Sequence, residues 1–448
     1  MPSFSIENFG CRATEADASA LRRELLASGL TPADDHAQAE VVVLNTCTVT
    51  AAADSQARDA VRKIHRANPT ARIVVTGCYA QRAPEELAAL DGVALVVGNS
   101  HQSQIPALLR ELRQPRAATE PVDFVPLQHL DSDAMSLERG PAKILTGDIF
   151  AQADVNISRS ATADLPAPDR TRPILKIQDG CNNRCSYCVI PFVRGRSRSL
   201  APDAVIAEVR TLVRAGAREI VLSGINLGSY GRDLTPRAAL ADVVHRILDE
   251  TAVERLRFSS IEPQDVTEDF VTLVASSPRL APHFHVPLQS GCDRILRAMH
   301  RWYRAAHYAE RVRMIRCLAP DAAIGADVIV GFPGETDADF DETAQFIAAL
   351  PFTYLHVFSF SERPGTAAAN LGDRVPAQAI RERARALRTL GEQKAAAFRA
   401  VQSGRTHRAL MLARCGDNWT EGLTGNYLKV RVPGRHPANE WHEVPLQD

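Results

Sequence analysis

Residues 174–188, ILKIQDGCNNRCSYC, place three cysteines directly after a short apolar run. Cys181, Cys185 and Cys188 have the spacing C-x3-C-x2-C. Three thiolates from one loop can hold three irons of a 4Fe-4S cube and leave the fourth iron without a protein ligand. Structural zinc sites and electron-transfer clusters are usually closed by four protein ligands. The stretch therefore predicts an iron–sulfur cluster with one open iron, which is a site for chemistry.

The chain that follows this stretch alternates strand patterns with helix patterns. From residue 173 to about residue 360, six apolar runs are separated by amphipathic segments such as 202–215 and 238–250. The runs are ILKIQ, EIVLSGIN, RLRFSSIE, FHVPLQ, AIGADVIVG and YLHVFSF. Tandem β/α units form parallel barrels, whose active sites lie at the carboxyl ends of the strands. We predict a central (β/α)6 barrel, either complete or left open as a partial barrel.

The first hundred residues show the same alternation on a smaller scale. Apolar runs precede Cys11, Cys47 and Cys78, and a fourth run ends near residue 99. Helical patterns at 15–27, 51–66 and 84–90 separate the runs. This βαβ repetition predicts an N-terminal doubly wound parallel sheet, so the overall fold class is α/β.

The three amino-terminal cysteines each follow a predicted strand. Because the carboxyl ends of parallel strands share one edge of the sheet, Cys11, Cys47 and Cys78 are expected to converge there. The alternative is that they are buried core residues, since free cysteine is often buried. The repetition at three strand ends favours a second cluster site.

Composition divides the chain into four segments and bounds its class. We predict an N-terminal domain at 1–114, an irregular Pro-, Asp- and Ser-rich segment and linker at 115–170, the barrel with a trailing helix at 171–400, and a small C-terminal β module at 401–448. The sequence has neither a signal-peptide pattern nor an apolar run long enough to cross a membrane. We therefore expect a cytoplasmic protein without a membrane partner.

The motif CNNRCSYC resembles that of the radical S-adenosylmethionine superfamily. Together with three amino-terminal cysteines, it resembles the methylthiotransferase family over nearly the whole chain. The resemblance implies two 4Fe-4S clusters and S-adenosylmethionine as cofactors, with a methylthio group attached to a tRNA base or a ribosomal protein. It also implies an electron donor such as flavodoxin or ferredoxin, and a possible sulfur donor.

Four stretches resemble one branch of that family. They are ILKIQDGCNNRCSYCVIPFVRGRSRSL, EIVLSGINLGSYG, VPLQSGCDRILRAMHR and DVIVGFPGET. The branch acts on threonylcarbamoyladenosine next to the anticodon, so the implied partner is the tRNA anticodon stem-loop. Two alternatives remain: the same chemistry on isopentenyladenosine or a ribosomal protein, and a non-catalytic metal-binding protein that binds RNA.

Three features depart from the family pattern. Thr14 stands where Asn is common, and Cys292 stands where Ser is usual. The terminal module resembles the family's small RNA-binding TRAM domain but has fewer than 50 residues. Cys292, Cys317 and Cys415 are left over from the two triplets, and a packing role suffices for them.

Polar residues at the predicted strand ends are candidates for binding S-adenosylmethionine. They are Tyr187, Gly224, Asn226, Glu262, Gln289 and Asp327. Each could instead be a capping or loop residue. No general base can be assigned from the sequence. His283, His285 and His300 also lie near strand ends, where we expect packing or hydrogen bonding rather than metal binding.

Basic residues near the cluster loop are candidates for RNA binding. With 52 Lys and Arg against 53 Asp and Glu, the chain has a net charge of -1, so RNA must meet a local basic surface. We expect Arg194, Arg196 and Arg198 to bind phosphate, and Trp302 and Tyr303 to stack on bases. Residues 381–448 carry a local net charge of +5. The alternative there is a solvated Arg-rich helix.

Overall fold

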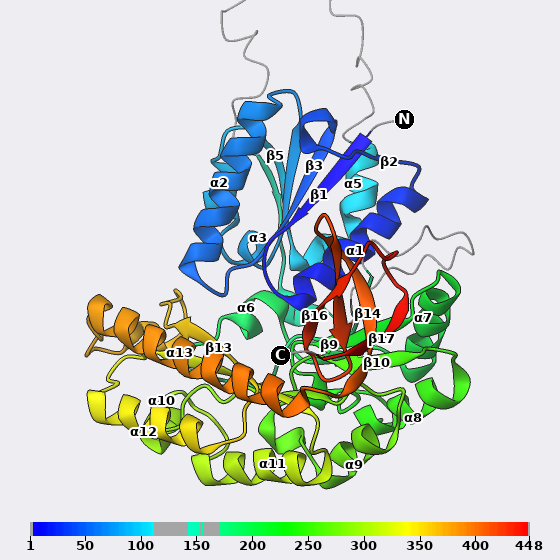
Figure 1. Cartoon of the computed structure of the whole chain (residues 1–448). Helices are drawn as coiled ribbons and strands as arrows, with labels where there is room; N and C mark the ends of the chain where they lie inside the picture. Colours follow the sequence, from blue (N-terminus) through cyan, green and yellow to red (C-terminus); the bar gives the residue numbers. More distant parts are fainter. Residues whose placement is uncertain (1–2, 112–141, 153–154, 156–170, 447–448) are drawn as a thin grey trace, which may run out of the picture.

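The computed structural model describes residues 3–111, 142–152, 155 and 171–446. It has three parts, an N-terminal sheet, an open barrel and a small antiparallel module (Figure 1). The prediction of a mixed α/β fold with these three parts is confirmed. Within the described ranges, no helix combines the length and the apolar character needed to span a bilayer.

The N-terminal sheet is parallel and has the strand order β2-β1-β3-β4-β5-β6. Its strands are β1 (Ser3–Asn8), β2 (Thr31–Pro32), β3 (Val41–Thr46), β4 (Arg72–Gly77), β5 (Val93–Gly98) and β6 (Lys143–Leu145). Every residue of β3 is buried, as its run of β-branched and apolar residues predicts. Strand β6 lies inside the segment predicted to be irregular, and that prediction is wrong for these residues. The rest of 115–170 lies mostly outside the described residues.

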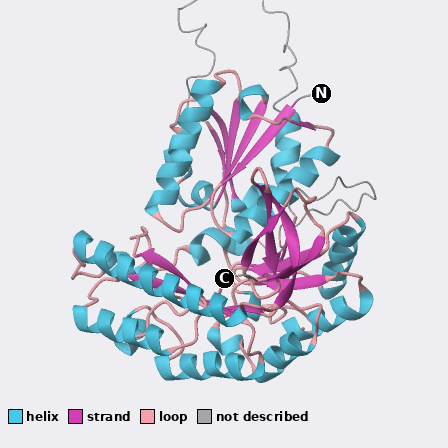
Figure 2. Ribbon diagram, viewed as in Figure 1, coloured by secondary structure: helices cyan, strands magenta, loops and turns pink. Residues whose placement is uncertain are grey.

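Helices cover both faces of this sheet, which makes it doubly wound (Figure 2). One face is covered by α1 (Arg12–Ala27) and α5 (Ile105–Glu111). The other face is covered by α2 (Ala51–Ala67), α3 (Cys78–Arg82) and α4 (Pro84–Ala88). After β1, the strand order continues on opposite sides of β1, with β2 on one side and β3 on the other. The point between β1 and β3 is therefore a topological switch point, where open α/β sheets bind ligands.

Six parallel strands form the open barrel, in two sheets of order β10-β9-β7 and β11-β12-β13. They are β7 (Ile174–Asp179), β9 (Glu219–Gly224), β10 (Arg255–Phe258), β11 (His283–His285), β12 (Ala323–Val330) and β13 (Tyr354–Ser359). Parallel bridges from Leu256 to Leu280 and from Ser260 to His285 join the sheets. The free edge of β7 pairs antiparallel with the short β8 (Arg198–Ser199).

Outer helices pack on the barrel strands in one continuous apolar core. They are α7 (Pro202–Arg214), α8 (Leu240–Glu250), α9 (Glu268–Ser276), α11 (Ala305–Leu318), α12 (Asp337–Ala349) and α13 (Ala377–Gln402). Two short helices, α6 (Ile190–Arg194) and α10 (Asp293–Ala298), follow the strand ends. The long α13 runs along β13, the last strand of the barrel (Figure 1).

The C-terminal module is an antiparallel sheet of order β16-β15-β14-β17. Its strands are β14 (Thr406–Cys415), β15 (Trp419–Thr424), β16 (Lys429–Pro433) and β17 (Trp441–Pro445). Two barrel arginines dock it: Arg255 donates to the Leu423 carbonyl at 3.0 Å, and Arg257 donates to the Thr424 carbonyl at 3.1 Å. Both arginines also pair with the fully buried Glu219.

Glu219→Gln is expected to destabilise the junction of barrel and module. Burial alone would raise the pKa of Glu219, but the charges of Arg257 and Arg255 lower it to about 2. Removing the carboxylate leaves two buried guanidinium groups without their anion, which costs roughly 3–5 kcal/mol. Urea unfolding followed by circular dichroism measures this loss. The stabilisation is complete above roughly pH 4.5 and disappears as the pH falls towards 2.

The matched control is Glu250→Gln, which removes an exposed ion pair with Arg246 on α8. This variant should unfold almost as the unsubstituted chain does, because exposed pairs contribute little. Equal unfolding midpoints for the two variants would contradict the role given to Glu219.

Candidate cluster and cofactor site

The structure brings the three amino-terminal cysteines to one edge of the sheet. Cys11 follows β1 and caps α1, Cys47 follows β3, and Cys78 follows β4 and begins α3. Cys47 is 4% exposed and Cys78 is 1% exposed, whereas Cys11 is exposed. Burial, together with the neighbouring Cys78 and Cys11 thiols, raises the pKa of Cys47 to about 12. The sequence prediction that these thiols converge is therefore supported by the geometry.

Gly10 allows the loop that carries Cys11 to pack closely against Cys47. Its φ of +121° is one that side-chain-bearing residues rarely adopt, and a Cβ at this position would lie 2.4 Å from the Cys47 Cβ. Thr14, the departure from the family pattern, donates from its hydroxyl to the Cys11 carbonyl at 2.7 Å. Thr14 thus closes the first turn of α1 behind the cysteine.

The second triplet lies in the loop between β7 and α6. Burial raises the pKa of Cys181 to about 11 and that of Cys188 to about 12. The Asn183 backbone N–H donates to the Cys181 Sγ at 3.4 Å, and the Arg301 guanidinium donates to the Cys185 Sγ at 3.3 Å. These donors would stabilise thiolates, the form in which cysteine binds metal.

The donor sets fit iron–sulfur clusters better than single zinc ions. All nine cysteines are free thiols. Three thiolates on one zinc ion, each at about 2.3 Å, would lie roughly 3.8 Å apart. Within the described part of the chain, neither triplet has its three sulfurs within 4.8 Å of one another. The wider spacing suits a group that separates its ligands, such as a cubic cluster.

A cavity of about 210 Å³ lies beside the second triplet, between the barrel and the N-terminal domain. Cys188 lines it together with Gln289 and Asp327 from the barrel, and Val49 and Thr50 enter from the N-terminal domain. The other lining residues are Tyr187, Val189, Ile190, Ile329, Phe358, Ser359, Phe360 and Ser361. Both cysteine triplets therefore border one inter-domain region, since Cys47 is two residues before Val49.

The six candidates for binding S-adenosylmethionine divide into two groups. Tyr187, Gln289 and Asp327 line the cavity, whereas Gly224, Asn226 and Glu262 do not.

The second group lies beside the cluster loop. Asn226 is buried near Cys181, and its Oδ1 has no hydrogen-bond partner among the described residues. Glu262 pairs with Arg301, the residue that donates to Cys185. Gly224 lies against Gln178, because a Cβ there would come within 2.9 Å of the Gln178 side chain.

Asp327 is held by two histidines from neighbouring strands. It accepts from the His285 Nε2 at 2.9 Å and from the His356 Nδ1 at 3.2 Å. Burial would raise the pKa of Asp327, but these hydrogen bonds lower it. His283 and His285 also share the Tyr354 hydroxyl, at 2.8 and 2.9 Å. Hydrogen bonding by His283 and His285 is confirmed, although His285, Asp327 and His356 bring ligand atoms close enough for a metal ion.

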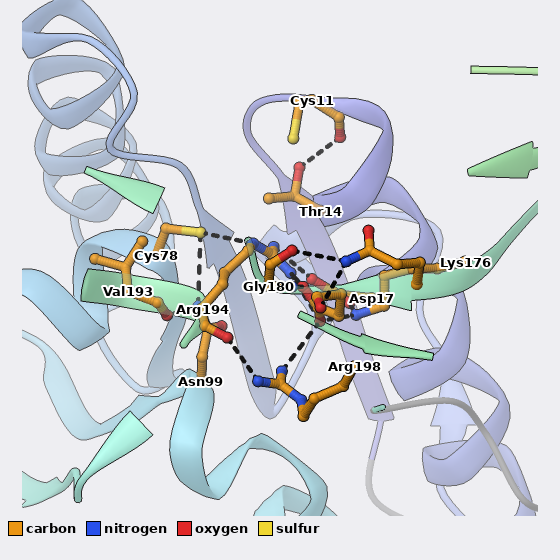
Figure 3. A network of polar contacts seen from close by, with 12 residues as sticks. Cys11, Thr14, Asp17, Cys78, Asn99, Lys176, Gly180, Val193, Arg194 and Arg198 are labelled. Carbon is orange, nitrogen blue, oxygen red and sulfur yellow. Dashed lines mark hydrogen bonds and ion pairs between the residues drawn. The ribbon is translucent and has the colours of Figure 1, made fainter. Parts of the chain in front are cut away.

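Two of the three arginines predicted to bind RNA are buried, so the prediction is wrong for Arg194 and Arg198. Arg194 is 2% exposed and contacts Cys78 and Asp17 (Figure 3). It also donates to Asp179. Arg198 is also buried and donates to the carbonyls of Arg194 and Arg196, both at 2.9 Å. Arg196 alone of the three is exposed.

The predicted stacking residues differ in the same way. Tyr303 is buried and donates to the Leu288 carbonyl at 2.6 Å, so the prediction that it stacks on a base is wrong. Trp302 is 73% exposed and stays a candidate. No role was predicted for Arg301, which ends the stretch VPLQSGCDRILRAMHR, yet this residue is buried and donates to Cys185.

The leftover cysteines also divide. Cys292 is buried in a small apolar cluster with Ile295 and Met299, as a packing role predicts. Cys317 and Cys415 are exposed, so packing does not account for them.

Comparisons with known proteins agree with this geometry. Residues 3–98 match the uncharacterized protein family UPF0004, and residues 175–347 match the radical SAM superfamily. The chain is 35% identical to the threonylcarbamoyladenosine tRNA methylthiotransferase MtaB of Aquifex aeolicus, covering 96% of each chain. It is 36% identical to the tRNA-2-methylthio-N(6)-dimethylallyladenosine synthase of Syntrophobacter fumaroxidans, over 83% of this chain and 76% of that protein.

The fold also resembles a solved structure. The radical S-adenosylmethionine methyltransferase TsrM of Kitasatospora setae, with cobalamin and a [4Fe-4S] cluster bound, superposes with a TM-score of 0.55 at 17% identity, covering 82% of this chain and 77% of that chain. This similarity supports the fold of the barrel and of the N-terminal domain that precedes it in the chain. The chain has matches to both domain families and is similar to named relatives over nearly its whole length. Together with the two cysteine triplets, these findings lead to one conclusion: the chain belongs to the radical S-adenosylmethionine tRNA methylthiotransferases.

Proposed function

We propose that this enzyme adds a methylthio group to C2 of threonylcarbamoyladenosine in the tRNA anticodon stem-loop, using two 4Fe-4S clusters. The observation that carries the proposal is the cavity between the domains, with one cysteine triplet on the barrel side and the other close behind Val49. S-adenosylmethionine and 4Fe-4S chemistry are the cofactors of the family. A tRNA substrate also favours the cytoplasm as the place of the reaction.

Each triplet has a defined part in this proposal. Cys181, Cys185 and Cys188 would hold the cluster whose open iron binds S-adenosylmethionine, and Cys11, Cys47 and Cys78 would hold the other cluster. When bound, the cofactors supply a radical and a methyl group. The protein supplies position and a shielded environment, because apolar side chains dominate the cavity wall.

The polar groups of the cavity and of the cluster loop suit the ligand that the family uses. Asn226 presents a buried acceptor without a protein partner, and Glu262 and Asp327 present carboxylates. These groups match an ammonium and ribose hydroxyls. Arg301 orients Glu262 and donates to Cys185, so it ties the cofactor-binding side to the cluster loop.

The extent of similarity favours threonylcarbamoyladenosine over the alternative base. The relatives named for threonylcarbamoyladenosine from Aquifex aeolicus and Bacillus subtilis match 96% and 97% of this chain, and 96% and 91% of their own lengths. The dimethylallyladenosine synthase of Thermobifida fusca matches 87% of this chain and 74% of its own length. That of Acidothermus cellulolyticus matches 98% of this chain but 81% of its own length, so the share of the relative's own length separates the two groups. The second candidate is therefore the same chemistry on an isopentenyl-type adenosine.

Mass spectrometry of tRNA nucleosides from a deletion strain separates these two functions. We expect 2-methylthio-threonylcarbamoyladenosine to disappear, with its unthiolated precursor accumulating, and to return when the gene is restored. Loss of the 2-methylthio-isopentenyladenosine nucleoside instead would assign the chain to the second candidate. Unchanged tRNA nucleosides would contradict both and point to a protein substrate.

Anaerobic reconstitution separates the enzyme from a non-catalytic metalloprotein that binds RNA. Two 4Fe-4S clusters require about eight irons per chain. A reduced flavodoxin or ferredoxin, the electron donors that we propose, should then support cleavage of S-adenosylmethionine. One zinc ion per chain and no cleavage would reject the enzyme. Omitting or adding a sulfide source in the same assay shows whether a separate sulfur donor is needed.

Arg196→Gln is expected to weaken tRNA binding without affecting the clusters. Arg196 is exposed just beyond the cluster loop, where its guanidinium is available to a phosphate. Loss of one such contact costs about 1 kcal/mol and lowers the dependence of log Kd on log salt by roughly one unit. Fluorescence anisotropy with an anticodon stem-loop measures both. Arg210→Gln on the outer helix α7 is the control, and equal affinities for the two variants would contradict the proposed contact.

A further inference from the structure

Arg194 is a buried arginine that contacts a predicted cluster ligand in another domain. It ends α6, just after the radical-cluster loop, and its Nε donates to the Cys78 Sγ at 3.2 Å. Its Nη2 donates to the Asp17 carboxylate at 2.7 Å, and its Nη1 donates to both Asp179 oxygens at 3.1 and 3.2 Å. Figure 3 shows the guanidinium lying between Cys78 and Asp17. All three sides of the planar fork are therefore engaged.

Both carboxylates of this network have cationic partners apart from the sulfur. Lys176 also pairs with Asp17 and donates to Asp179 at 2.6 Å, and Arg198 lies 4.0 Å from the Asp179 carboxylate, so three cations surround the two carboxylates. A buried ion pair needs such hydrogen bonds to offset its desolvation. Asp17 and Asp179 would keep cationic partners in Lys176 and Arg198 even without Arg194. The contact from Arg194 to Cys78 adds a partner that these ion pairs do not require.

Cys78 has a second donor that enters from the same side. The Asn99 Nδ2 lies 3.6 Å from the Cys78 Sγ and donates to the Val193 carbonyl at 2.8 Å. Val193 precedes Arg194, so both donors to this sulfur are tied to α6. Hydrogen bonds to cluster sulfurs and nearby positive charge stabilise the more negative, reduced form of a cluster.

The network also reaches the other cluster loop. Asp179, which accepts from Arg194, is the last residue of β7 and lies two positions before Cys181. Gly180 between them has a φ of +70°, and a Cβ there would lie 2.0 Å from the Arg196 carbonyl oxygen, so the loop packs tightly on this segment. A short path of contacts thus runs from Cys78 through Arg194 and Asp179 to Cys181.

We propose that Arg194 is a positioning residue of the amino-terminal cluster: it donates a hydrogen bond to the Cys78 thiolate, favours the reduced form of that cluster and fixes its place against the radical-cluster loop. This inference rests on the proposed function, in which Cys11, Cys47 and Cys78 hold a cluster. It assigns to the network a role in the chemistry of sulfur transfer, in addition to joining the two domains.

The test isolates the amino-terminal cluster in the full-length chain. Cys181, Cys185 and Cys188 are all replaced by Ala, which leaves one cluster of about four irons. A redox titration monitored by electron paramagnetic resonance then gives its midpoint potential. Arg194→Gln should lower this potential, because it removes the positive charge and the donor to Cys78. Arg194→Lys should restore part of the shift, because it keeps the charge but loses the fork.

Asp17→Asn distinguishes tuning from simple loosening of the network. It removes a negative charge from the same network and leaves Arg194 in place, so the potential should rise. Arg196→Gln, two residues further and exposed, should leave the potential unchanged. Shifts of the same sign for Arg194→Gln and Asp17→Asn, or no shift for Arg194→Gln, would overturn the inference.

The failure of the proposed function gives a different result. If the triple cysteine variant binds no cluster while the unsubstituted chain binds only about four irons, the amino-terminal triplet is not a cluster site. That outcome rejects the two-cluster proposal itself. A cluster present in the triple variant, with a potential that does not respond to Arg194, rejects the role of Arg194 alone.

Discussion

Cys185→Ala is expected to abolish the reductive cleavage of S-adenosylmethionine. Cys185 is one of three ligands in the loop after β7, and Arg301 directs a guanidinium N–H at its sulfur. With two thiolates left, the radical cluster loses the geometry that presents one open iron. Iron should fall from about eight to about four per chain, and 5′-deoxyadenosine should fall to the level of a reaction without enzyme.

Chromatography of the 5′-deoxyadenosine formed under dithionite measures this effect. Cys317→Ala, which removes an exposed thiol on α11, should leave both the iron content and the cleavage unchanged. Substantial cleavage by the Cys185 variant would mean that the radical cluster has another set of ligands.

Cys47→Ala should separate the two halves of the reaction. Cys47 is buried at the carboxyl end of β3, at the edge of the sheet shared with Cys11 and Cys78. Removing one of three thiolates should release the amino-terminal cluster, so methylthio transfer should fall below detection. The loop holding Cys181, Cys185 and Cys188 belongs to the barrel, so cleavage of S-adenosylmethionine should continue without coupling to the substrate.

Persistent cleavage also serves as the control for folding of this variant. The two products, 5′-deoxyadenosine and the methylthiolated nucleoside, are measured in the same reaction by liquid chromatography and mass spectrometry. If Cys47→Ala still thiolates tRNA, the amino-terminal cysteines have a structural role and the sulfur enters by another route.

Much of the fold could be predicted because its signals are local. Strand and helix patterns alternate with few interruptions, and each amino-terminal cysteine directly follows a strand. Parallel strand ends share an edge, so the convergence of Cys11, Cys47 and Cys78 follows from sequence position. Strand β6 was missed because three partly exposed residues have no clear periodicity and depend on pairing with β5.

The exposure and the contacts of the arginines could not be predicted from local sequence. Arg194 and Arg196 belong to the same RGRSR run, yet Arg194 is buried and Arg196 is exposed. One ion-pair partner of the buried Arg194 is Asp17, which lies 177 residues earlier in the chain and in another domain. Arg301 was missed for the same reason, since its partners Cys185 and Glu262 become its neighbours only in the folded barrel. Tertiary contacts determine whether an arginine side chain is exposed to solvent or donates to a buried thiol.

The cavity has a comparable origin. Its barrel side includes Gln289 and Asp327, which the sequence analysis placed at strand ends. Its other side includes Val49 and Thr50, which enter from the N-terminal domain. Position after a strand predicts the first pair, whereas the second pair depends on how the domains pack.

A defined reaction tests most directly whether the enzyme, with a cluster on each cysteine triplet, thiolates threonylcarbamoyladenosine. The reconstituted chain is incubated with reductant, S-adenosylmethionine and two anticodon stem-loops, one carrying threonylcarbamoyladenosine and the other isopentenyladenosine. Mass spectrometry should detect a methylthio group on the threonylcarbamoyladenosine alone. Cleavage of S-adenosylmethionine with both nucleosides unmodified, or thiolation of isopentenyladenosine alone, would contradict the account.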